Sequence, residues 1–381
     1  MKSKHILWVV LIILITISLG FGTIFISDGP TPPQTDSIKV DSIESYSTKE
    51  LAIGSLTVLK PIQHENLQVF AIVSKAEISN RKYVTLNEAM KNNLVKLNET
   101  GQVNSLSIDN LSNEYIFIQA GDIVKGGKQD RTLQTDLILP PHSVDVALNS
   151  FCVEQGRWTN RGNEDVSQFS YSEKNLSSRD LKFAAKKEGN QSMVWGKVKE
   201  QQDKLNENMV KKYDDTNIRV ENAASTSSYQ LTLENDKLVE FQEEYRKTLE
   251  AILKTENIVG LAYAVNGEVY GLDAFNNYEL FNDLSDKLLD AFIIEAISQK
   301  NDDEFKPVSI NEISELLVIE EKMKATTTNT RKLNEITEYA FEEYGLTNKY
   351  LTSDLSLKKW LHLNFIIASN ETLQLDYNPR R

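Results

Sequence analysis

The chain has 381 residues and a mass of 43.3 kDa, with 40% hydrophobic and 25% charged residues. This composition is typical of a globular protein and excludes a collagen-like or mostly disordered chain. Lys and Arg number 42 and Asp and Glu number 55, so the net charge is −13. The single cysteine, Cys152, excludes an intramolecular disulfide framework and an all-cysteine metal cluster.

Residues 6–26 form an apolar segment long enough to cross a membrane. These 21 residues carry no charge, and as a helix they would span roughly 30 Å, the thickness of a bilayer core. Lys2 and Lys4 precede the segment and acidic residues follow it, so the positive-inside rule places the N-terminus in the cytoplasm. We expect residues 1–26 to be a single-pass membrane anchor, with the globular part extracytoplasmic. A signal peptide that is cleaved, leaving a secreted protein, is the alternative.

The charge of the remaining chain limits its partners. Residues 1–26 contain two lysines and no acid, so the rest carries 40 − 55 = −15. A strongly acidic domain repels phosphate polymers, so we expect no nucleic-acid partner. Outside the cytoplasm a lone thiol is either buried or able to pair between chains, and the apolar surroundings of Cys152 favour burial.

The first half of the globular part is predicted to be rich in strands. Residues 27–50 contain Pro, Gly, Ser and acidic residues and are expected to be a linker. Residues 51–160 alternate apolar and polar positions, which predicts a sheet or a barrel-like arrangement. The predicted strands are 56–59, 67–73, 94–98, 103–109, 115–119, 133–139 and 144–153. Thr85 and Glu88 form a capping-box pattern that predicts one short helix.

Residues 161–381 are predicted to be a helical and mixed part of the same globular unit. Helices are expected within 176–254, the first with an N-cap at Ser177 and a stop at Gly189. Asn266-Gly267 joins two predicted strands, 258–265 and 268–272, as a two-residue hairpin.

Further helices and one more strand are predicted after this hairpin. An amphipathic helix is expected over 280–297, a second helix after Ser309-x-x-Glu312, a loop at 326–330 and a final strand at 360–367. The order of strands, helices, hairpin, helices and strand predicts an α+β fold.

The inventory of reactive residues excludes several kinds of site. The four histidines, His5, His64, His142 and His362, are not at metal-ligand spacing. Gly-x-Ser-x-Gly, Gly-x-Gly-x-x-Gly and a complete P-loop are missing from the sequence. We therefore expect no metal and no cofactor.

The segment 121–131 is the first candidate for binding. Gly126-Gly127 lets the backbone turn tightly and approach another group. Lys125, Lys128 and Arg131 make a positive cluster that could hold a carboxylate or phosphate, with Arg131 as a fork-shaped donor. The alternative is a hairpin loop whose charges are solvated or paired with its own two aspartates.

The segment 152–158, Cys-Val-Glu-Gln-Gly-Arg-Trp, is the second candidate. Arg157 could bind an anion or pair with Glu154. Trp158 could stack on a ligand ring or belong to the core. A nucleophilic Cys152 would need a base, and His142 is the only histidine near it in the sequence.

These two segments carry a family resemblance. The order of several short motifs resembles that of one bacterial and archaeal family. These motifs are Thr85-Leu-Asn-Glu-Ala, Val103-Asn-Ser-Leu, Gly121-Asp and Gly126-Gly-Lys-Gln-Asp-Arg, followed by the segment 152–158. That family is named for its association with ADP-ribosylglycohydrolases and rhodanese-phosphatases, and the resemblance covers about residues 51–370. It implies a shared fold and, loosely, metabolism or sensing of ADP-ribose-like compounds. The apolar N-terminal segment departs from that intracellular setting.

Three functional hypotheses remain open. The first is a membrane-anchored extracytoplasmic domain, tethered through residues 6–26, that binds a polar or anionic small molecule or a partner. Its candidate ligand-binding residues are Lys128, Gln129, Arg131, Glu154, Arg157 and Trp158, with Gly126 and Gly127 shaping the loop. The second is a hydrolase of a phosphorylated or glycosidic, ADP-ribose-like molecule, with Glu154 or Asp130 as general acid or base. The third is a purely structural or interaction domain.

Overall fold

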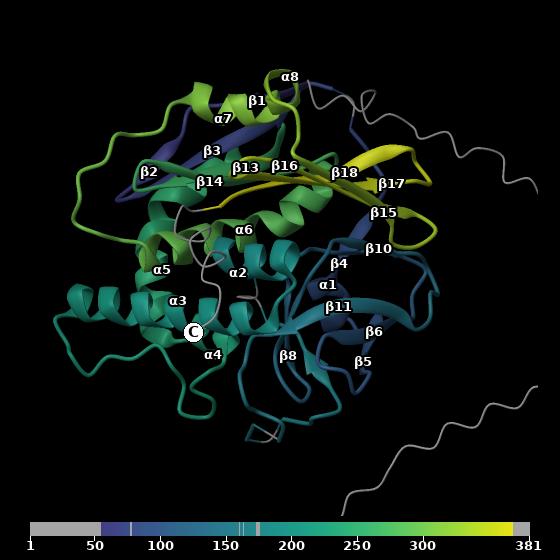
Figure 1. Ribbon diagram of the computed structural model, residues 1–381, viewed down its shortest axis with the longest axis horizontal. Coiled ribbons are helices and arrows are strands. Elements are labelled where there is room, and N and C mark those ends of the chain that lie inside the picture. The colour runs from purple at the N-terminus through teal and green to yellow at the C-terminus, as the bar shows by residue number, and fades with distance from the viewer. Residues whose placement is uncertain (1–54, 77, 160, 163, 173–175, 369–381) are drawn as a thin grey trace, which may run out of the picture. The chain divides into compact units, whose positions relative to one another are not determined.

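The structure is a computed structural model that describes residues 55–76, 78–159, 161–162, 164–172 and 176–368 (Figure 1). The expected anchor and linker, residues 1–50, lie outside the described residues. No helix within the described ranges is long and apolar enough to cross a membrane. The described part belongs to one compact unit and is a mixed α+β fold, as predicted.

The largest sheet has nine antiparallel strands. Their order is β1-β3-β13-β14-β18-β17-β16-β15. Strand β2 also pairs with β3, on the same edge as β1 but with the first residues of β3, 67–69, whereas β1 pairs with residues 72–74. The bounds are β1 (Leu56–Val58), β2 (Ile62–His64), β3 (Leu67–Ser74), β13 (Ile258–Val265), β14 (Glu268–Phe275), β15 (Thr327–Lys332), β16 (Thr337–Tyr344), β17 (Thr347–Asp354) and β18 (Lys359–Ile367). Asn266 and Gly267 join β13 to β14 at φ angles of +50° and +77°, which confirms the predicted hairpin.

Apolar side chains line both faces of this sheet except at the edge strand β15, and helices pack on both faces. Helix α6 (Tyr278–Ser298) packs on one face, and α7 (Ile310–Leu317) and α8 (Ile319–Lys322) cover the other (Figure 1). Helix α6 is buried on nearly all sides because α3 and α5 pack against it opposite the sheet. Its apolar residues Leu280 to Ile297 lie toward the sheet and these helices, as the predicted amphipathic pattern requires.

Two smaller sheets form the near-barrel part that was expected in the first half. One has the order β12-β8-β9-β11-β6-β5 and the other β10-β7-β4, and together they enclose a separate apolar core. The bounds are β4 (Tyr83–Thr85), β5 (Val95–Glu99), β6 (Ser105–Asn110), β7 (Tyr115–Ile118), β8 (Ile123–Gly126), β9 (Arg131–Leu133), β10 (Leu137–Leu139), β11 (Val146–Cys152) and β12 (Phe169–Ser170). The first half of β11 pairs with β6 and its second half with β9.

The remaining helices begin and end close to their sequence signals. They are α1 (Leu86–Lys91), α2 (Arg179–Phe183), a π-helix η3 (Ala184–Glu188), α3 (Gln191–Tyr213), α4 (Tyr229–Leu233), α5 (Asp236–Leu249) and a 3₁₀-helix η4 (Glu250–Lys254). Thr85 caps α1 by accepting a hydrogen bond from the Glu88 amide at 3.2 Å, and Ser309 and Glu312 form a complete capping box on α7. Ser178, not Ser177, is the N-cap of α2.

Two predicted elements differ from the structure. The predicted strand 133–139 is two strands, β9 and β10, because the chain between them turns Asp136 into the interior of the protein. The predicted loop 326–330 lies largely in strand β15, which is exposed at all six positions and pairs with β16. Its threonines favour extended backbone without needing burial.

Candidate functional site

The two candidate segments meet in one buried network, called here the arginine cluster: Asp130, Arg131, Glu154, Arg157 and Arg161. The Asp130 and Glu154 side chains are fully buried. Arg161 donates to both carboxylate oxygens of Asp130, at 2.8 and 3.0 Å, and to Glu154 Oε1 at 3.1 Å. This is the two-pronged geometry in which guanidinium and carboxylate bind most strongly.

Arg157 fixes the two-glycine turn. Its guanidinium donates to the carbonyl oxygens of Gly126 and Gly127 at 3.1 and 3.0 Å, and its Nε lies 2.7 Å from Glu154 Oε1. Gly127 has a φ of +55°, and a Cβ there would overlap the ring of Phe169. The predicted close approach at this turn is therefore confirmed, and the approaching groups belong to the protein itself.

Arg131 and Cys152 lie side by side in the interior. Arg131 donates to Gln129 Oε1 at 3.2 Å and to the sulfur of Cys152, and its Nη2 lies 3.6 Å from Glu99 Oε2. Burial raises the pKa of the Cys152 thiol to about 11, which keeps it a neutral and weak nucleophile. Cys152 is buried as expected. His142 does not act as its base, because the His142 ring bonds to Asn113 at 2.8 Å.

The predicted ligand-binding residues are thus only partly brought together. Gln129, Arg131, Glu154 and Arg157 are buried around the cluster, where Gln129 Nε2 also donates to the Glu154 carbonyl at 2.6 Å. Lys128 is only half-buried and Trp158 is 51% exposed. Asp130 and Glu154 pair with Arg157 and Arg161, and Glu99 pairs with Arg131. Because each arginine already has a carboxylate partner, this geometry favours a structural role, in which the cluster holds the turn and the end of β11 together, over binding of an anion.

The sequence did not identify two members of this network. Arg161 follows the second segment by three residues, and Ser228, in the small polar loop before α4, donates to Asp130 Oδ2 at 2.7 Å. An arginine next to glycine just beyond Trp158 was the available signal. The Ser228 contact joins segments 98 residues apart in the chain, and local spacing contains no trace of it.

A second buried network surrounds His362. The His362 ring lies between two carboxylates, with Nδ1 2.7 Å from Asp136 Oδ2 and Nε2 3.1 Å from Asp273 Oδ1. Burial alone would lower the pKa of His362, but the two carboxylates outweigh burial and raise it. Burial opposes the charge of Asp136 too, but His362 lowers the pKa of that carboxyl. This network joins the near-barrel part to the large sheet.

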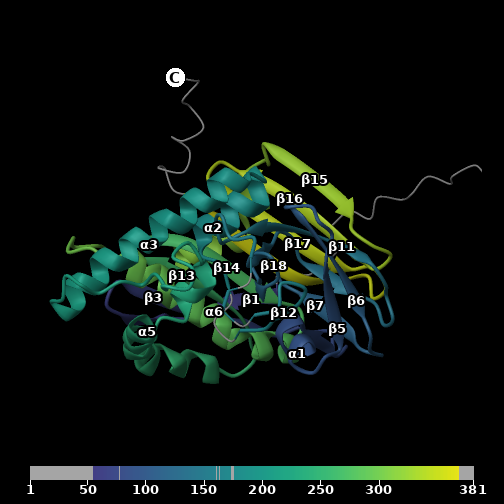
Figure 2. The same cartoon turned by 90° about the horizontal axis from the view of Figure 1, so that it is seen from below.

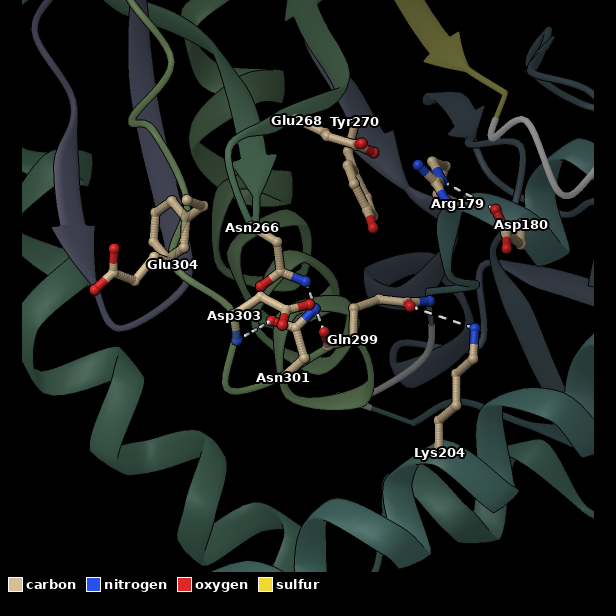
Figure 3. A pocket seen from close by; sticks show the side chains of 11 residues that line it. Arg179, Asp180, Lys204, Asn266, Glu268, Tyr270, Gln299, Asn301, Asp303 and Glu304 are labelled. Carbon is tan, nitrogen blue, oxygen red and sulfur yellow. Dashed lines mark hydrogen bonds and ion pairs between the residues drawn. The ribbon is translucent and has the colours of Figure 1, made fainter.

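An open cavity of about 460 Å³, called here the polar pocket, lies at the hairpin end of β13 and β14 (Figure 3). It is bordered by α2, by α3 and by the chain that follows α6. The lining residues are Arg179, Asp180, Lys204, Asn266, Glu268, Tyr270, Gln299, Asn301, Asp303, Glu304 and Phe305. Asn266 anchors the wall by donating to the Gln299 carbonyl at 2.7 Å.

The cations of the polar pocket are already engaged. Arg179 donates to Asp180 at 2.9 Å and its guanidinium lies 3.6 Å from the centre of the Tyr270 ring. Lys204 donates to Glu200 at 2.8 Å and to Gln299 at 3.3 Å. Three lining carboxylates differ from these cations: Glu268 on β14, and Asp303 and Glu304 in the loop after α6. Within the described ranges, no hydrogen bond or ion pair reaches their side chains.

A smaller cavity that shares part of its lining with the polar pocket contains a buried acid. A small cavity of about 10 Å³, enough for about one water, shares Asp180, Lys204 and Gln299 with the polar pocket and is also lined by Glu295. Glu295 is 2% exposed and accepts a hydrogen bond from the Arg179 amide at 2.9 Å. Burial raises the pKa of Glu295 to about 7. A carboxyl of shifted pKa beside a cavity is typical of a functional site.

Sequence patterns did not predict this pocket. Its residues span 179–305 and come from several elements that are adjacent only after folding. One local signal existed, because Glu295 interrupts the apolar run Phe292 to Ile297 on the helix that the sequence predicts to be amphipathic. The described residues contain no group of three or more His, Cys, Asp or Glu side chains placed to hold a metal ion.

Comparison with known proteins gives one match. The model of one family, described as the ARG and Rhodanese-Phosphatase-superfamily-associated Protein domain, ARPP-1, matches residues 55–366. No curated protein matches the chain, and no solved structure matches it.

Proposed function

The chain belongs to the ARPP-1 family, and from that premise we propose that its domain binds a polar small molecule in the polar pocket. The observation that carries this proposal is the contrast between the two sites. The arginine cluster is buried and each of its arginines is paired with a carboxylate, Glu99 in the case of Arg131. The polar pocket, in contrast, is open and leaves carboxylate and amide groups facing solvent. Concave sites with a few converging polar groups are where small ligands bind.

We also propose that this binding takes place outside the cytoplasm. The uncharged run at residues 6–26, with lysines before it and acids after it, supports a single membrane anchor with the domain on the far side. A tethered domain at that location would meet small molecules of the cell's surroundings.

The binding proposal is tested by thermal unfolding of the full-length chain in detergent with three related probes. These are sorbitol, its amine analogue N-methylglucamine and its phosphate ester sorbitol 6-phosphate. We expect at least one probe to raise the Tm, because a ligand that binds only the folded state stabilises it. An Asn301→Trp substitution fills the pocket mouth and should abolish the shift, whereas Asn217→Trp, on an exposed loop outside the lining, should retain it. No shift with any probe, or a shift that survives in Asn301→Trp, would overturn the proposal.

A further inference from the structure

The charges of the polar pocket narrow the class of its ligand. Resting on the proposed function, we infer that the pocket selects small hydroxylated organic cations, such as amino polyols, over their neutral and anionic analogues. Arg179 and Lys204 already bond to Asp180 and Glu200. An anion entering the pocket would have to displace an existing carboxylate partner of either cation.

The mouth of the pocket supplies the attraction for a positive charge. Glu268, Asp303 and Glu304 are exposed side chains that line it. An ammonium about 4 Å from one carboxylate gains about 1 kcal/mol in water-like surroundings and more where the walls exclude water. The charge of −15 on residues 27–381 also raises the local concentration of cations around the domain.

The small cavity beside the polar pocket supplies groups suited to hydroxyls. Gln201 is 7% exposed, lines the small cavity, and its Nε2 is buried without a hydrogen-bond partner in the described part of the chain. A buried amide donor without a partner is costly. A hydroxyl group or a water that bridges to one would supply the missing acceptor and could donate in turn to the Glu295 carboxylate.

Glu295 lines the small cavity that shares Asp180, Lys204 and Gln299 with the polar pocket, so a cation bound there should alter its protonation. The charged and titratable groups that surround it are Arg179 and Asp180 from α2, Lys197, Glu200 and Lys204 from α3, Tyr229 from α4, Tyr263 from β13 and Tyr270 from β14. The pKa of Glu295 lies near 7 because burial disfavours its charge. A bound cation favours the carboxylate, so it should expel the proton, and the affinity should rise as the pH increases through about 7.

A lysine-lined cavity next to the polar pocket is the alternative place for an anion. This cavity of about 210 Å³ shares Asn301 with the polar pocket and is lined by Lys211, Lys212 and Lys300. Each lysine is paired with a glutamate: Glu207, Glu244 and Glu65, respectively. Because these lysines are already paired, we expect this cavity not to bind the anionic probe more tightly than the polar pocket binds the cationic one.

Isothermal titration of the full-length chain in detergent tests the ligand class. N-methylglucamine is an alkylamine and stays protonated between pH 6 and 8. We expect it to bind at least tenfold more tightly than sorbitol, and sorbitol 6-phosphate to bind more weakly than sorbitol. Glu268→Gln and Asp303→Asn should each weaken N-methylglucamine binding three- to tenfold and weaken sorbitol binding by a smaller factor. Glu335→Gln, an exposed glutamate outside the lining, serves as the control.

The pH series tests the proton linkage. From pH 6 to pH 8 the affinity of the wild-type chain for N-methylglucamine should rise, and Glu295→Gln should remove that rise. Equal affinities for N-methylglucamine and sorbitol, or tightest binding of sorbitol 6-phosphate, would overturn the inference while leaving the proposed function intact. If none of the three probes binds, the proposed function fails and this inference fails with it.

Discussion

At the residue scale, buried charges are the most unusual feature of the domain. Asp130 and Glu154 are fully buried and rely on Arg157 and Arg161 for compensation. Removing ions from water is costly, and their mutual attraction offsets this cost only with good geometry. Loss of one partner leaves a charge that the interior cannot solvate, so these residues should be sensitive to substitution whether or not a ligand binds nearby.

Arg161→Ala should lower the free energy of unfolding by about 3–5 kcal/mol, because the buried Asp130 loses its two-pronged partner and Glu154 loses one of its two arginines. The control is Arg219→Ala, since Arg219 is exposed and bonds only to carbonyl oxygens of its own loop; it should change stability by less than about 0.5 kcal/mol. Chemical denaturation at pH 7 measures both. Equal stabilities for the two variants would show that the arginine cluster does not hold the fold together.

The His362 network predicts a stability contribution that depends on pH. Its folded pKa is raised above 6.5, so its contribution is fully present below pH 6.5 and is lost as the pH rises through the folded pKa. The advantage of the wild-type chain over His362→Gln should therefore be largest between pH 5 and 6.5 and shrink at higher pH. A difference that is constant with pH would contradict this assignment.

Glu295 gives a matched comparison in another pH range. Its folded pKa of about 7 lies above the ordinary value of 4.5, so ionisation costs the folded state stability as the pH rises from 4.5 to 7. Glu295→Gln should gain stability relative to the wild-type chain over this range, and the difference should be constant above pH 7. Denaturation curves across the range measure it, and a gain that continues above pH 7 would contradict the burial argument.

At the element scale, local signals predicted the elements whose geometry is decided locally. The Asn266-Gly267 turn, the capping box of α7 and the stop at Gly189 are all where the sequence places them. Strands β16 and β17 were not predicted. Their positions follow from pairing with β15 and β18 across the sheet, and pairing between strands leaves little trace in local composition.

Two glycine substitutions test how local geometry acts on the fold. Gly267→Ala should destabilise the protein by about 1–3 kcal/mol, because its φ is +77° and a Cβ would lie 2.6 Å from the Lys306 carbonyl oxygen. Gly196→Ala, within helix α3 and with nothing within 4 Å of the new Cβ, should instead stabilise it by about 0.5–1 kcal/mol. Thermal unfolding distinguishes the two, and a stabilising Gly267→Ala would contradict the turn assignment.

At the scale of the whole molecule, the sequence predicted the fold class and the family but only part of the buried cluster. The two candidate segments do meet in the folded protein, through Gln129, Arg131, Glu154 and Arg157. The partners that decide their role, Arg161 and Ser228, arrive through tertiary packing. Their contacts depend on that packing and not on spacing along the chain. The same holds for the polar pocket, whose lining comes from α2, α3, the β13–β14 hairpin and the chain after α6. Figure 2 shows how these elements are arranged in space.

The proposed membrane anchor at residues 6–26 determines on which side of the membrane the whole domain lies. A C-terminal fusion to a reporter enzyme that needs disulfides to fold should be active in intact bacterial cells, because such enzymes mature only outside the reducing cytoplasm. The full-length fusion should remain in the membrane fraction after alkaline washing. An inactive fusion, or one that alkaline washing releases, would contradict an anchored extracytoplasmic domain.

The central claim is that the ligand site is the polar pocket and not the arginine cluster. Hydrogen–deuterium exchange of the full-length chain, with and without N-methylglucamine at saturating concentration, tests it most directly. We expect slower exchange at residues 178–180, 266–270 and 299–305, which surround the polar pocket, and no change at 126–131 and 154–158. Protection confined to 126–131 and 154–158 would contradict the account and place the ligand at the arginine cluster.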